Sequence, residues 1–197
     1  MRRAKERQQV ISLMGVPKTI DNDIPLIDFS FGFHTSVEVA ATMINAAYVE
    51  ATSVINGVGL VKLMGRYSGF IAMQASLVNN SVDFCLVPEL PFELGGECGL
   101  YEQVLKRVQE KGHCLIVVAE GAEEGLINPN EKITLVEKRD ASGNLQYDEV
   151  GDFLEKALVD FAISKNVVFS LSYIDPTYSI RSVAANPADT LLCTTLA

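Results

Sequence analysis

The sequence lacks the closely spaced cysteines and histidines of a metal or redox site. Its two histidines, His34 and His113, have no partner pattern, and none of its four cysteines belongs to a CxxC motif or a Cys/His cluster. Zinc centres and redox dithiols depend on such spacing. We therefore expect free thiols in a reducing compartment, rather than disulfides or zinc ligands, at Cys85, Cys98, Cys114 and Cys193.

Long apolar runs and an excess of positive charge are also missing. No run of about 18 apolar residues occurs, so we expect no membrane-spanning helix. Residues 1–9 are basic, but no apolar region follows them, which argues against a secretory signal. Acidic residues number 25 against 16 basic ones, and the net charge of −9 disfavours nucleic acid or an anionic membrane as the main partner. A few arginines in a pocket would still suffice for a phosphorylated substrate.

The composition that is present, with 48% hydrophobic and 21% charged residues in a chain of 197, is typical of one large folded domain or two small ones. Short apolar runs predict strands at 10–14, 57–64, 83–89, 113–121 and 167–174. Apolar residues at three- and four-residue steps predict helices at 34–54, 66–78 (after an opening turn), 100–112, 152–165 and from Pro187 onward. The charged stretch 122–151 predicts an excursion with a hairpin. This alternation predicts an α/β fold with a mostly parallel sheet flanked by helices.

Distinctive loops follow four of the expected strands. They read GVPKTIDND (15–23), MGRYSG (64–69), PE (88–89) and AEG (119–121). In α/β folds ligands bind beyond the carboxyl ends of parallel strands. We therefore expect these loops to converge on one ligand site.

The first loop crowds charged and polar groups into six positions. Asp21 or Asp23 could accept a proton from a substrate hydroxyl or reach a magnesium ion. Lys18 and Thr19 would suit a transferring phosphoryl group. The alternative is an Asx-rich turn that caps the following helix.

Candidate ligand-binding side chains also follow later strands. Arg66 stands between glycines and could bind a phosphate, or could be an ordinary surface arginine. Glu120 ends an apolar strand and could hold sugar hydroxyls, or could be a solvated acid. Tyr178 and Arg181 are three residues apart, on one side of a helical turn, where such a pair can clamp a phosphate.

Four motifs in this order, PKTIDND, MGRYSG, AEG and YIDPTYSIR, closely resemble the phosphofructokinase family, in the branch found in plants and some protists and bacteria. The resemblance extends from about residue 9 to residue 197. It implies a phosphofructokinase-like α/β fold in which residues 1–197 form the sugar-phosphate-binding portion of one domain. It also implies that part of the donor-binding half precedes residue 1 and that the C-terminal end of the domain follows Ala197.

The resemblance assigns roles to residues of this chain. Asp21 would be the proton acceptor, with Thr19 and Arg66 as further catalytic residues. The site for the sugar phosphate would consist of Thr19, Ile20, Asp21, Met64, Gly65, Arg66, Glu120, Tyr178, Ser179, Ile180 and Arg181. Lys18 and Asp23 would face the donor and the transition state, and no metal site is expected within residues 1–197 themselves.

The implied activity is that of ATP-dependent 6-phosphofructokinase, a cytoplasmic or plastid enzyme of glycolysis that is allosteric and forms a homo-oligomer, a dimer or a tetramer. It would transfer the γ-phosphoryl group of ATP to the 1-hydroxyl of fructose 6-phosphate with Mg²⁺. Compared with bacterial ATP enzymes of the family, this chain has Gly57 in place of an arginine and Lys18 in place of a glycine; this lysine is typical of pyrophosphate-using members and of plant-like ATP enzymes. The donor motifs GGDGT and GGDD are both missing. Pyrophosphate as donor and a silent regulatory subunit therefore remain alternatives, and residues 1–197 alone are expected to be inactive.

Overall fold

The protein is described by a computed structural model that covers residues 6, 10–12, 14–122, 138–139, 145–146 and 150–196. Its centre is a four-stranded sheet in the order β2-β3-β1-β6, and all three neighbouring pairs are parallel. The strands of this sheet are β1 (Gly57–Leu63), β2 (Phe84–Leu86), β3 (His113–Ala119) and β6 (Ser170–Ile174). The helices are α2 (Phe33–Ser53), α3 (Phe70–Leu77), α4 (Leu100–Lys111), α5 (Val150–Ser164), α6 (Thr177–Arg181) and α7 (Pro187–Leu196). The predicted α/β class and parallel sheet are confirmed.

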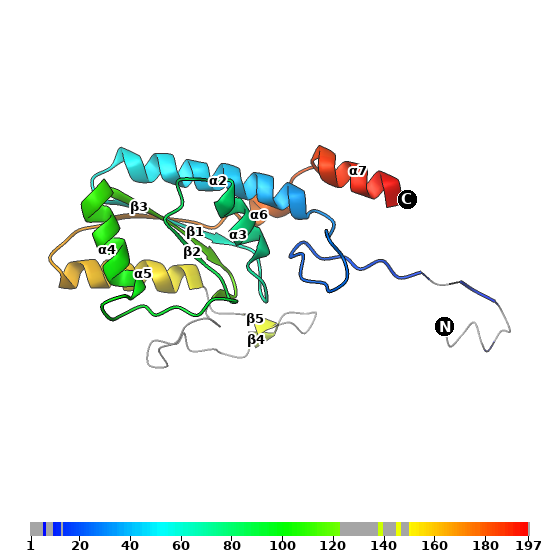
Figure 1. Ribbon diagram of the computed structural model, residues 1–197, viewed down its shortest axis with the longest axis horizontal. Helices are drawn as coiled ribbons and strands as arrows, with labels where there is room; N and C mark the ends of the chain where they lie inside the picture. Colours follow the sequence, from blue (N-terminus) through cyan, green and yellow to red (C-terminus); the bar gives the residue numbers. More distant parts are fainter. Residues whose placement is uncertain are drawn as a thin grey trace.

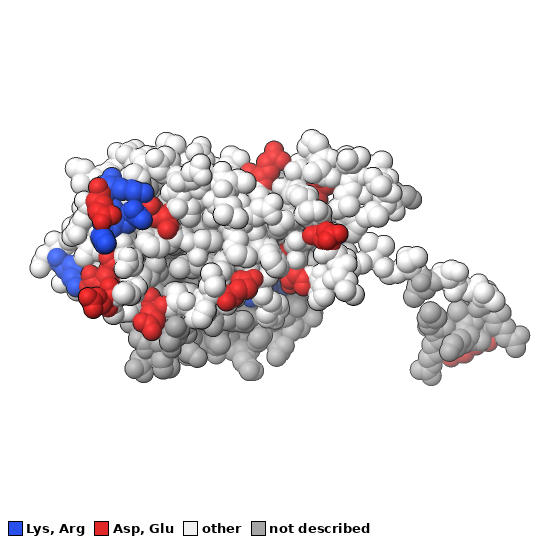
Figure 2. Space-filling model, in the orientation of Figure 1, with Lys and Arg blue, Asp and Glu red and all other residues white. Residues whose placement is uncertain are grey.

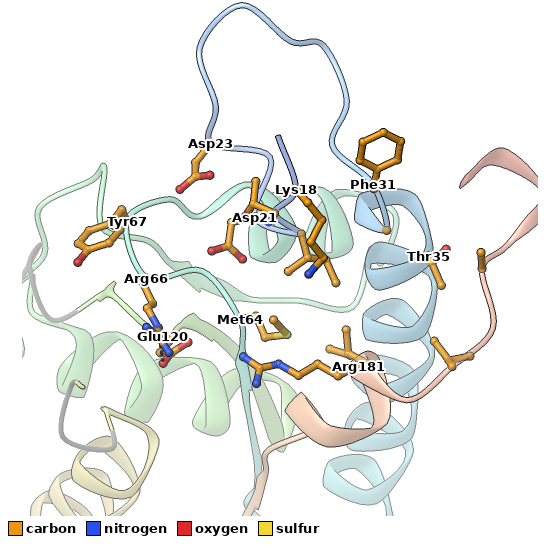
Figure 3. A pocket seen from close by; sticks show the side chains of 16 residues that line it. Lys18, Asp21, Asp23, Phe31, Thr35, Met64, Arg66, Tyr67, Glu120 and Arg181 are labelled. Carbon is orange, nitrogen blue, oxygen red and sulfur yellow. Dashed lines mark hydrogen bonds and ion pairs between the residues drawn. The ribbon is translucent and has the colours of Figure 1, made fainter. Parts of the chain in front are cut away.

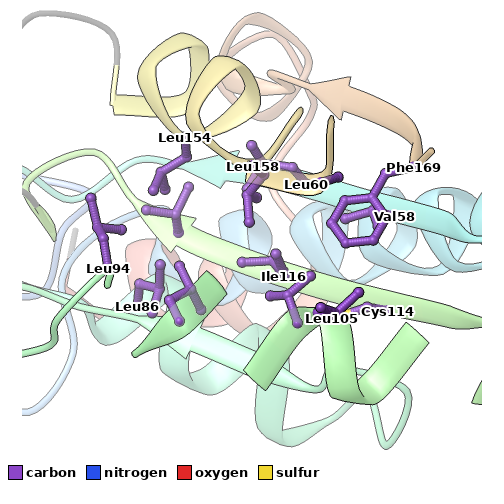
Figure 4. Packing of buried hydrophobic residues seen from close by; sticks show 14 of the residues in the cluster. Val58, Leu60, Leu86, Leu94, Leu105, Cys114, Ile116, Leu154, Leu158 and Phe169 are labelled. Carbon is purple, nitrogen blue, oxygen red and sulfur yellow. The ribbon is translucent and has the colours of Figure 1, made fainter. Parts of the chain in front are cut away.

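The helices cover both faces of this sheet (Figure 1). Side chains of α2, α3 and α6 form one buried apolar cluster with one face, and side chains of α4 and α5 form a second cluster with the other. Alternate residues of β1 enter the two clusters, with Leu60 facing α5 and Val61 facing α2. Figure 4 shows the second cluster, in which Leu154 and Leu158 of α5 lie over Leu60. A strand buried on both faces has no polar side, which explains why β1 and β3 were predictable from their apolar runs.

Glycines let α2 lie close to β1. A Cβ atom at Gly57 would lie 1.9 Å from the backbone oxygen of Ala51, and one at Gly59 would lie 3.2 Å from that of Ala47. Any side chain at position 57 would therefore collide with the backbone of α2.

The strand predicted at 10–14 is wrong. Residues 10–12 and 14 lie in no strand, and the side chains of Val10, Ile11 and Met14 are 102%, 57% and 87% exposed. An apolar run becomes a buried strand only where a neighbouring strand and a covering layer receive it, and no described strand pairs with this run.

Other boundaries differ less. The strand predicted at 83–89 shortens to β2, because Asp83 turns its carboxylate to the backbone N–H of Leu115 and Pro88 has no N–H to donate. β6 begins at Ser170 instead of residue 167. Within the excursion, β4 (Lys138–Arg139) and β5 (Leu145–Gln146) pair antiparallel, as expected of a hairpin, and residues 123–137, 140–144 and 147–149 lie outside the described residues.

Basic side chains on the face shown in Figure 2 gather over α4 among carboxylates. Arg107 Nε and Lys111 Nζ lie 3.2 and 3.1 Å from Asp83 Oδ1, and Lys165 Nζ lies 2.6 Å from Glu102 Oε1. All four cysteines have free thiols, and burial raises the pKa of Cys85 and Cys114. Within the described part of the chain, no helix has the length and apolar character needed to cross a bilayer.

Candidate functional site

A cavity of about 810 Å³ lies at the carboxyl edge of the sheet, between the loop of residues 18–23, the ends of β1 and β3, α6 and the start of α2 (Figure 3). Ten of the predicted site residues line it: Lys18, Thr19, Ile20, Asp21, Asp23, Met64, Arg66, Glu120, Ile180 and Arg181. The predicted convergence of the loops after β1 and β3 with the TIDND loop is therefore confirmed in space. It does not depend on a strand before that loop.

The TIDND loop is held by its own side chains. Thr19 Oγ1 accepts a hydrogen bond of 3.1 Å from the backbone N–H of Asp21, and Asn22 Oδ1 accepts one of 2.7 Å from the N–H of Ser30. Asn22 has a left-handed backbone (φ 58°), a conformation that asparagine tolerates. Ser68 Oγ donates to the carbonyl of Asp21 at 3.2 Å, which ties the loop to the β1–α3 connection. Asn22 therefore shapes the turn, and Asp21 and Asp23 line the cavity, but no described side chain of this loop caps the following helix α2, whose start is bonded to Asp189 instead.

Close backbone approach joins the loops after β1 and β3. Gly65 has φ 131° and its carbonyl accepts a hydrogen bond of 2.9 Å from the N–H of Gly121. A Cβ atom at Gly121 would lie 1.9 Å from the backbone oxygen of Arg66, so only glycine fits there. This contact brings Arg66 Nε to 3.6 Å from Glu120 Oε1 (Figure 3).

The carboxyl group of Asp21 has an elevated pKa. Partial burial raises this pKa, the negative charges of Asp23 and Glu120 raise it further, and the positive charges of Arg66 and Arg181 oppose the rise. Among the described residues, none donates a hydrogen bond to the Asp21 carboxylate. A carboxylate with a raised pKa holds a proton more strongly than an ordinary aspartate, as a general base must.

α6 supplies the side of the cavity opposite the TIDND loop. Ile180 is 2% exposed and anchors this short helix in the apolar cluster, while Arg181 points into the cavity. Tyr178 is 82% exposed and, like Ser179 and Gly65, is not among the lining residues. The predicted Tyr178–Arg181 pair thus separates, with only the arginine at the cavity.

The PE loop after β2 contacts the start of α3 and not the cavity. Glu89 Oε1 accepts a hydrogen bond of 2.8 Å from the backbone N–H of Gly69, at the start of α3. Neither Pro88 nor Glu89 lines the cavity. This loop, unlike the other three predicted loops, therefore holds the neighbouring helix and does not face the ligand site.

The sequence did not predict the wall formed by the start of α2 and the chain after α6, which consists of Phe31, Gly32, Thr35, Val183 and Ala185. Tyr67, in the loop after β1, also lines the cavity. This wall depends on Asp189 of α7, which is 1% exposed. Its carboxylate accepts hydrogen bonds from the N–H of Gly32 (2.9 Å) and from the N–H and Oγ1 of Thr35 (2.7 and 2.5 Å). Burial alone would raise the pKa of Asp189, but these hydrogen bonds outweigh it and lower the pKa. The acidic residue in the first turn of α7 was the only local signal, and it gave no indication of a partner 157 residues away.

Metal-binding capacity at the cavity is limited. Within the described ranges, no group of three or more His, Cys, Asp or Glu side chains could hold an ion by itself. Asp21 and Asp23 offer two carboxylates on the same side of the cavity (Figure 3). Magnesium is commonly bound by one or two carboxylates together with phosphate oxygens, so these residues fit an ion that arrives with a phosphorylated ligand.

Fold and cavity together define an α/β protein with a charged ligand site at the carboxyl edge of a parallel sheet. The model of the family described as phosphofructokinase matches residues 1–197. The chain therefore belongs to the phosphofructokinase family.

Named relatives are similar over nearly the whole chain. ATP-dependent 6-phosphofructokinase 1 of Arabidopsis thaliana is 52% identical over 193 residues, which are 98% of this chain and 40% of the relative. ATP-dependent 6-phosphofructokinase of Borreliella burgdorferi is 42% identical over 198 residues, covering 98% of this chain and 43% of the relative. The chain thus spans about two fifths of the length of these relatives.

Solved structures share the fold at low sequence identity. The pyrophosphate-dependent phosphofructokinase of Marinobacter aquaeolei superposes with a TM-score of 0.64 at 24% identity, over 97% of this chain and 44% of that one. Phosphofructokinase of Pichia pastoris in the T-state gives a TM-score of 0.62 at 22% identity, over 90% of this chain and 17% of that one.

Proposed function

We propose that this chain forms the acceptor site of an ATP-dependent 6-phosphofructokinase. The reaction transfers the γ-phosphoryl group of ATP to the 1-hydroxyl of fructose 6-phosphate. The observation that carries the proposal is the Asp21 carboxyl, whose pKa is raised, in one cavity with Arg66 and Arg181. The names of the Arabidopsis and Borreliella relatives support ATP as the donor.

Asp21 accepts the proton of the 1-hydroxyl as this oxygen attacks the phosphoryl group. Thr19 fixes the backbone of Asp21 through its 3.1 Å hydrogen bond. Arg66 stabilises negative charge on the transferring group, and Lys18 and Asp23 face the donor from the outer side of the cavity. In phosphoryl transfer the protein mainly positions the reactants and neutralises charge, which these residue types can do.

The sugar phosphate lies between β1, β3 and α6. Arg181 binds the 6-phosphate through a charge-assisted hydrogen bond, while Met64 and Ile180 give the sugar an apolar floor. Glu120 holds the guanidinium of Arg66 and offers its remaining lone pairs to sugar hydroxyls. Gly65, Tyr178 and Ser179 do not line the cavity, so in the proposal they support the phosphate site as chain neighbours of Met64, Arg66 and Arg181.

Asp23, beside Asp21, would hold a magnesium ion together with the donor phosphates. Such an ion would neutralise charge on the phosphate groups. The working assembly is a homo-oligomer, a dimer or a tetramer, under allosteric control. We propose a cytoplasmic location for the protein. The plastid is the alternative, because a relative that is 50% identical is named chloroplastic.

Pyrophosphate is the competing donor, because Lys18 lines the cavity at the position where the family's pyrophosphate-using members carry lysine. A chimera tests the acceptor site together with Lys18: residues 1–197 replace the matched segment of the Arabidopsis enzyme, to which they are 52% identical, and the donor-binding half is that of the Arabidopsis enzyme. We expect fructose 1,6-bisphosphate from fructose 6-phosphate and Mg²⁺ with ATP and not with pyrophosphate. The parent Arabidopsis enzyme is the positive control, and the chimera with Asp21→Asn is the negative one.

Other outcomes of this assay reject the proposal. Turnover with pyrophosphate alone would show that residues 1–197 impose pyrophosphate as the donor even on the donor-binding half of an ATP enzyme. A folded chimera that binds fructose 6-phosphate in calorimetry and turns over with neither donor would support the silent regulatory subunit. The 197-residue chain alone, which has neither GGDGT nor GGDD, is expected to produce no bisphosphate in the same assay.

A further inference from the structure

A buried lysine lies in β1, two residues before the cavity residue Met64, and does not line the cavity itself. Lys62 is in β1 between Val61 and Leu63, and it is 7% exposed. Its Nζ lies 2.9 Å from Oδ2 of Asp175, the residue that follows β6. Because Val61 is in register with Ile174, the next residues along the two strands come side by side.

The same carboxylate also binds the start of α6. Asp175 Oδ1 accepts a hydrogen bond of 3.0 Å from the backbone N–H of Thr177, the first residue of the helix. One oxygen of Asp175 therefore contacts the strand through Lys62, and the other contacts the helix. Burial alone would raise the pKa of Asp175, but the hydrogen bonds from Thr177 and Lys62 outweigh it and lower the pKa.

The helix that Asp175 grips is short and carries a residue of the cavity. α6 runs only from Thr177 to Arg181, so its direction is set almost entirely by how its first turn is attached. Ile180 fixes one side in the apolar cluster, and Arg181 projects into the cavity (Figure 3). A change in the attachment at Asp175 therefore reaches the Arg181 guanidinium within two helical turns.

We propose that Lys62 and Asp175 form a positioning pair that directs Arg181 into the cavity, and so sets the affinity for the phosphate of the sugar substrate. This inference rests on the proposed function. Lys62 is buried in an apolar strand, where a charge is costly unless it is paired, so the lysine and the half-exposed Asp175 hold each other in a defined position beside the start of α6. Neither side chain lines the cavity, so neither touches the substrate.

The Arg181 side chain provides a readout that needs no ligand. Its Nε–Hε signal in a proton–nitrogen NMR spectrum of the 197-residue chain reports whether the guanidinium keeps its place at the cavity.

The experiment is a double-mutant cycle between Asp175→Asn and Arg181→Ala. The asparagine can still accept the N–H of Thr177 but lacks the charge that holds Lys62. Lys62→Met removes the other member of the pair and should give the same result. The matched control is Glu102→Gln, which breaks the ion pair with Lys165 away from the cavity, at a carboxylate whose exposure of 37% equals that of Asp175.

We expect Asp175→Asn and Lys62→Met to move the Arg181 Nε–Hε signal toward the position of a solvent-exposed arginine. Glu102→Gln should leave this signal unchanged. In the chimera, Asp175→Asn should raise KM for fructose 6-phosphate about threefold to tenfold with kcat changed less than about twofold, and its effect should vanish in the Arg181→Ala background. A purely structural role would lower thermal stability in both backgrounds without this coupling.

An unchanged Arg181 Nε–Hε signal in Asp175→Asn and Lys62→Met, or additive effects on KM with Arg181→Ala, would overturn the positioning role. If the signal moves but the chimera turns over without any dependence of KM on Arg181, the pair still positions Arg181 and the phosphate-binding part of the proposed function is wrong. The two failures are therefore distinguishable.

Discussion

Two aspartates at the cavity wall show opposite behaviour. Asp189 is 1% exposed and accepts three hydrogen bonds from the start of α2, and its pKa is lowered. Asp21 is partly buried beside two other carboxylates, receives no hydrogen bond from the described residues, and its pKa is raised. The first carboxylate stabilises the fold, while the second is held at a cost in stability. A group kept in an unfavourable environment is a stronger candidate for chemistry than a group whose bonds are satisfied.

The largest effect is expected from removing the unsatisfied carboxylate. In the chimera, Asp21→Ser should lower kcat by about 10²–10⁴-fold, the usual contribution of a general base, while KM for fructose 6-phosphate changes little. Steady-state kinetics with varied sugar phosphate separates the two parameters. A kcat close to that of the unsubstituted chimera would remove Asp21 from the chemistry.

Asp189→Ala should instead act on stability. It leaves the N–H groups of Gly32 and Thr35 without an acceptor at a buried helix start, so the free energy of unfolding should fall by about 2–4 kcal/mol. Urea unfolding followed by circular dichroism measures this. An Asp189→Ala variant as stable as the unsubstituted chain would contradict the claim that the Asp189 carboxylate stabilises the fold.

Arg181→Ala tests whether the cavity that contains Asp21 binds the phosphate of the sugar. A charge-assisted hydrogen bond contributes roughly 1.5–3 kcal/mol, so KM for fructose 6-phosphate should rise about tenfold or more. Calorimetry with fructose as the unphosphorylated control tests whether the loss concerns the phosphate. Equal affinity in the presence and absence of the Arg181 side chain would make it a structural residue.

The smallest expected effect is a pH-dependent gain in stability from Asp21→Asn. Because the pKa of Asp21 is raised on folding, its ionised form is disfavoured in the native state, and stability falls as pH rises from about 3.8 through the native pKa. Asp21→Asn should therefore raise the melting temperature at pH 7, and the gain should disappear below the unfolded pKa. Asp189 has the opposite sign: its contribution is complete above pH 3.8 and is lost as pH falls through its lowered pKa.

Local signals in the sequence predicted much of this arrangement. β1 and β3 are buried on both faces, so their apolar runs were sufficient, and the loops after them could be placed at one edge by topology alone. The run at 10–14 has the same appearance, but no described strand receives it. A run of apolar residues shows that a segment can be buried, but it does not show which other segment would bury it.

Contacts between distant segments could not be predicted from local patterns in the sequence. The bond of Asp189 to Thr35 spans 154 residues, and Lys62 meets Asp175 only because β1 and β6 are neighbours in the sheet. The exposed position of Tyr178 likewise depends on how α6 sits on the sheet, although its spacing from Arg181 was correct for a helical turn.

The most direct test is to titrate both aspartates in one NMR experiment, on the 197-residue chain without ligand. The account predicts that the Asp21 carboxyl titrates above 3.8 and the Asp189 carboxyl below it, because burial and like charges dominate at one and hydrogen-bond donors at the other. Midpoints that coincide, or an Asp21 midpoint at or below 3.8, would contradict the claim that this cavity holds a carboxylate poised to accept a proton.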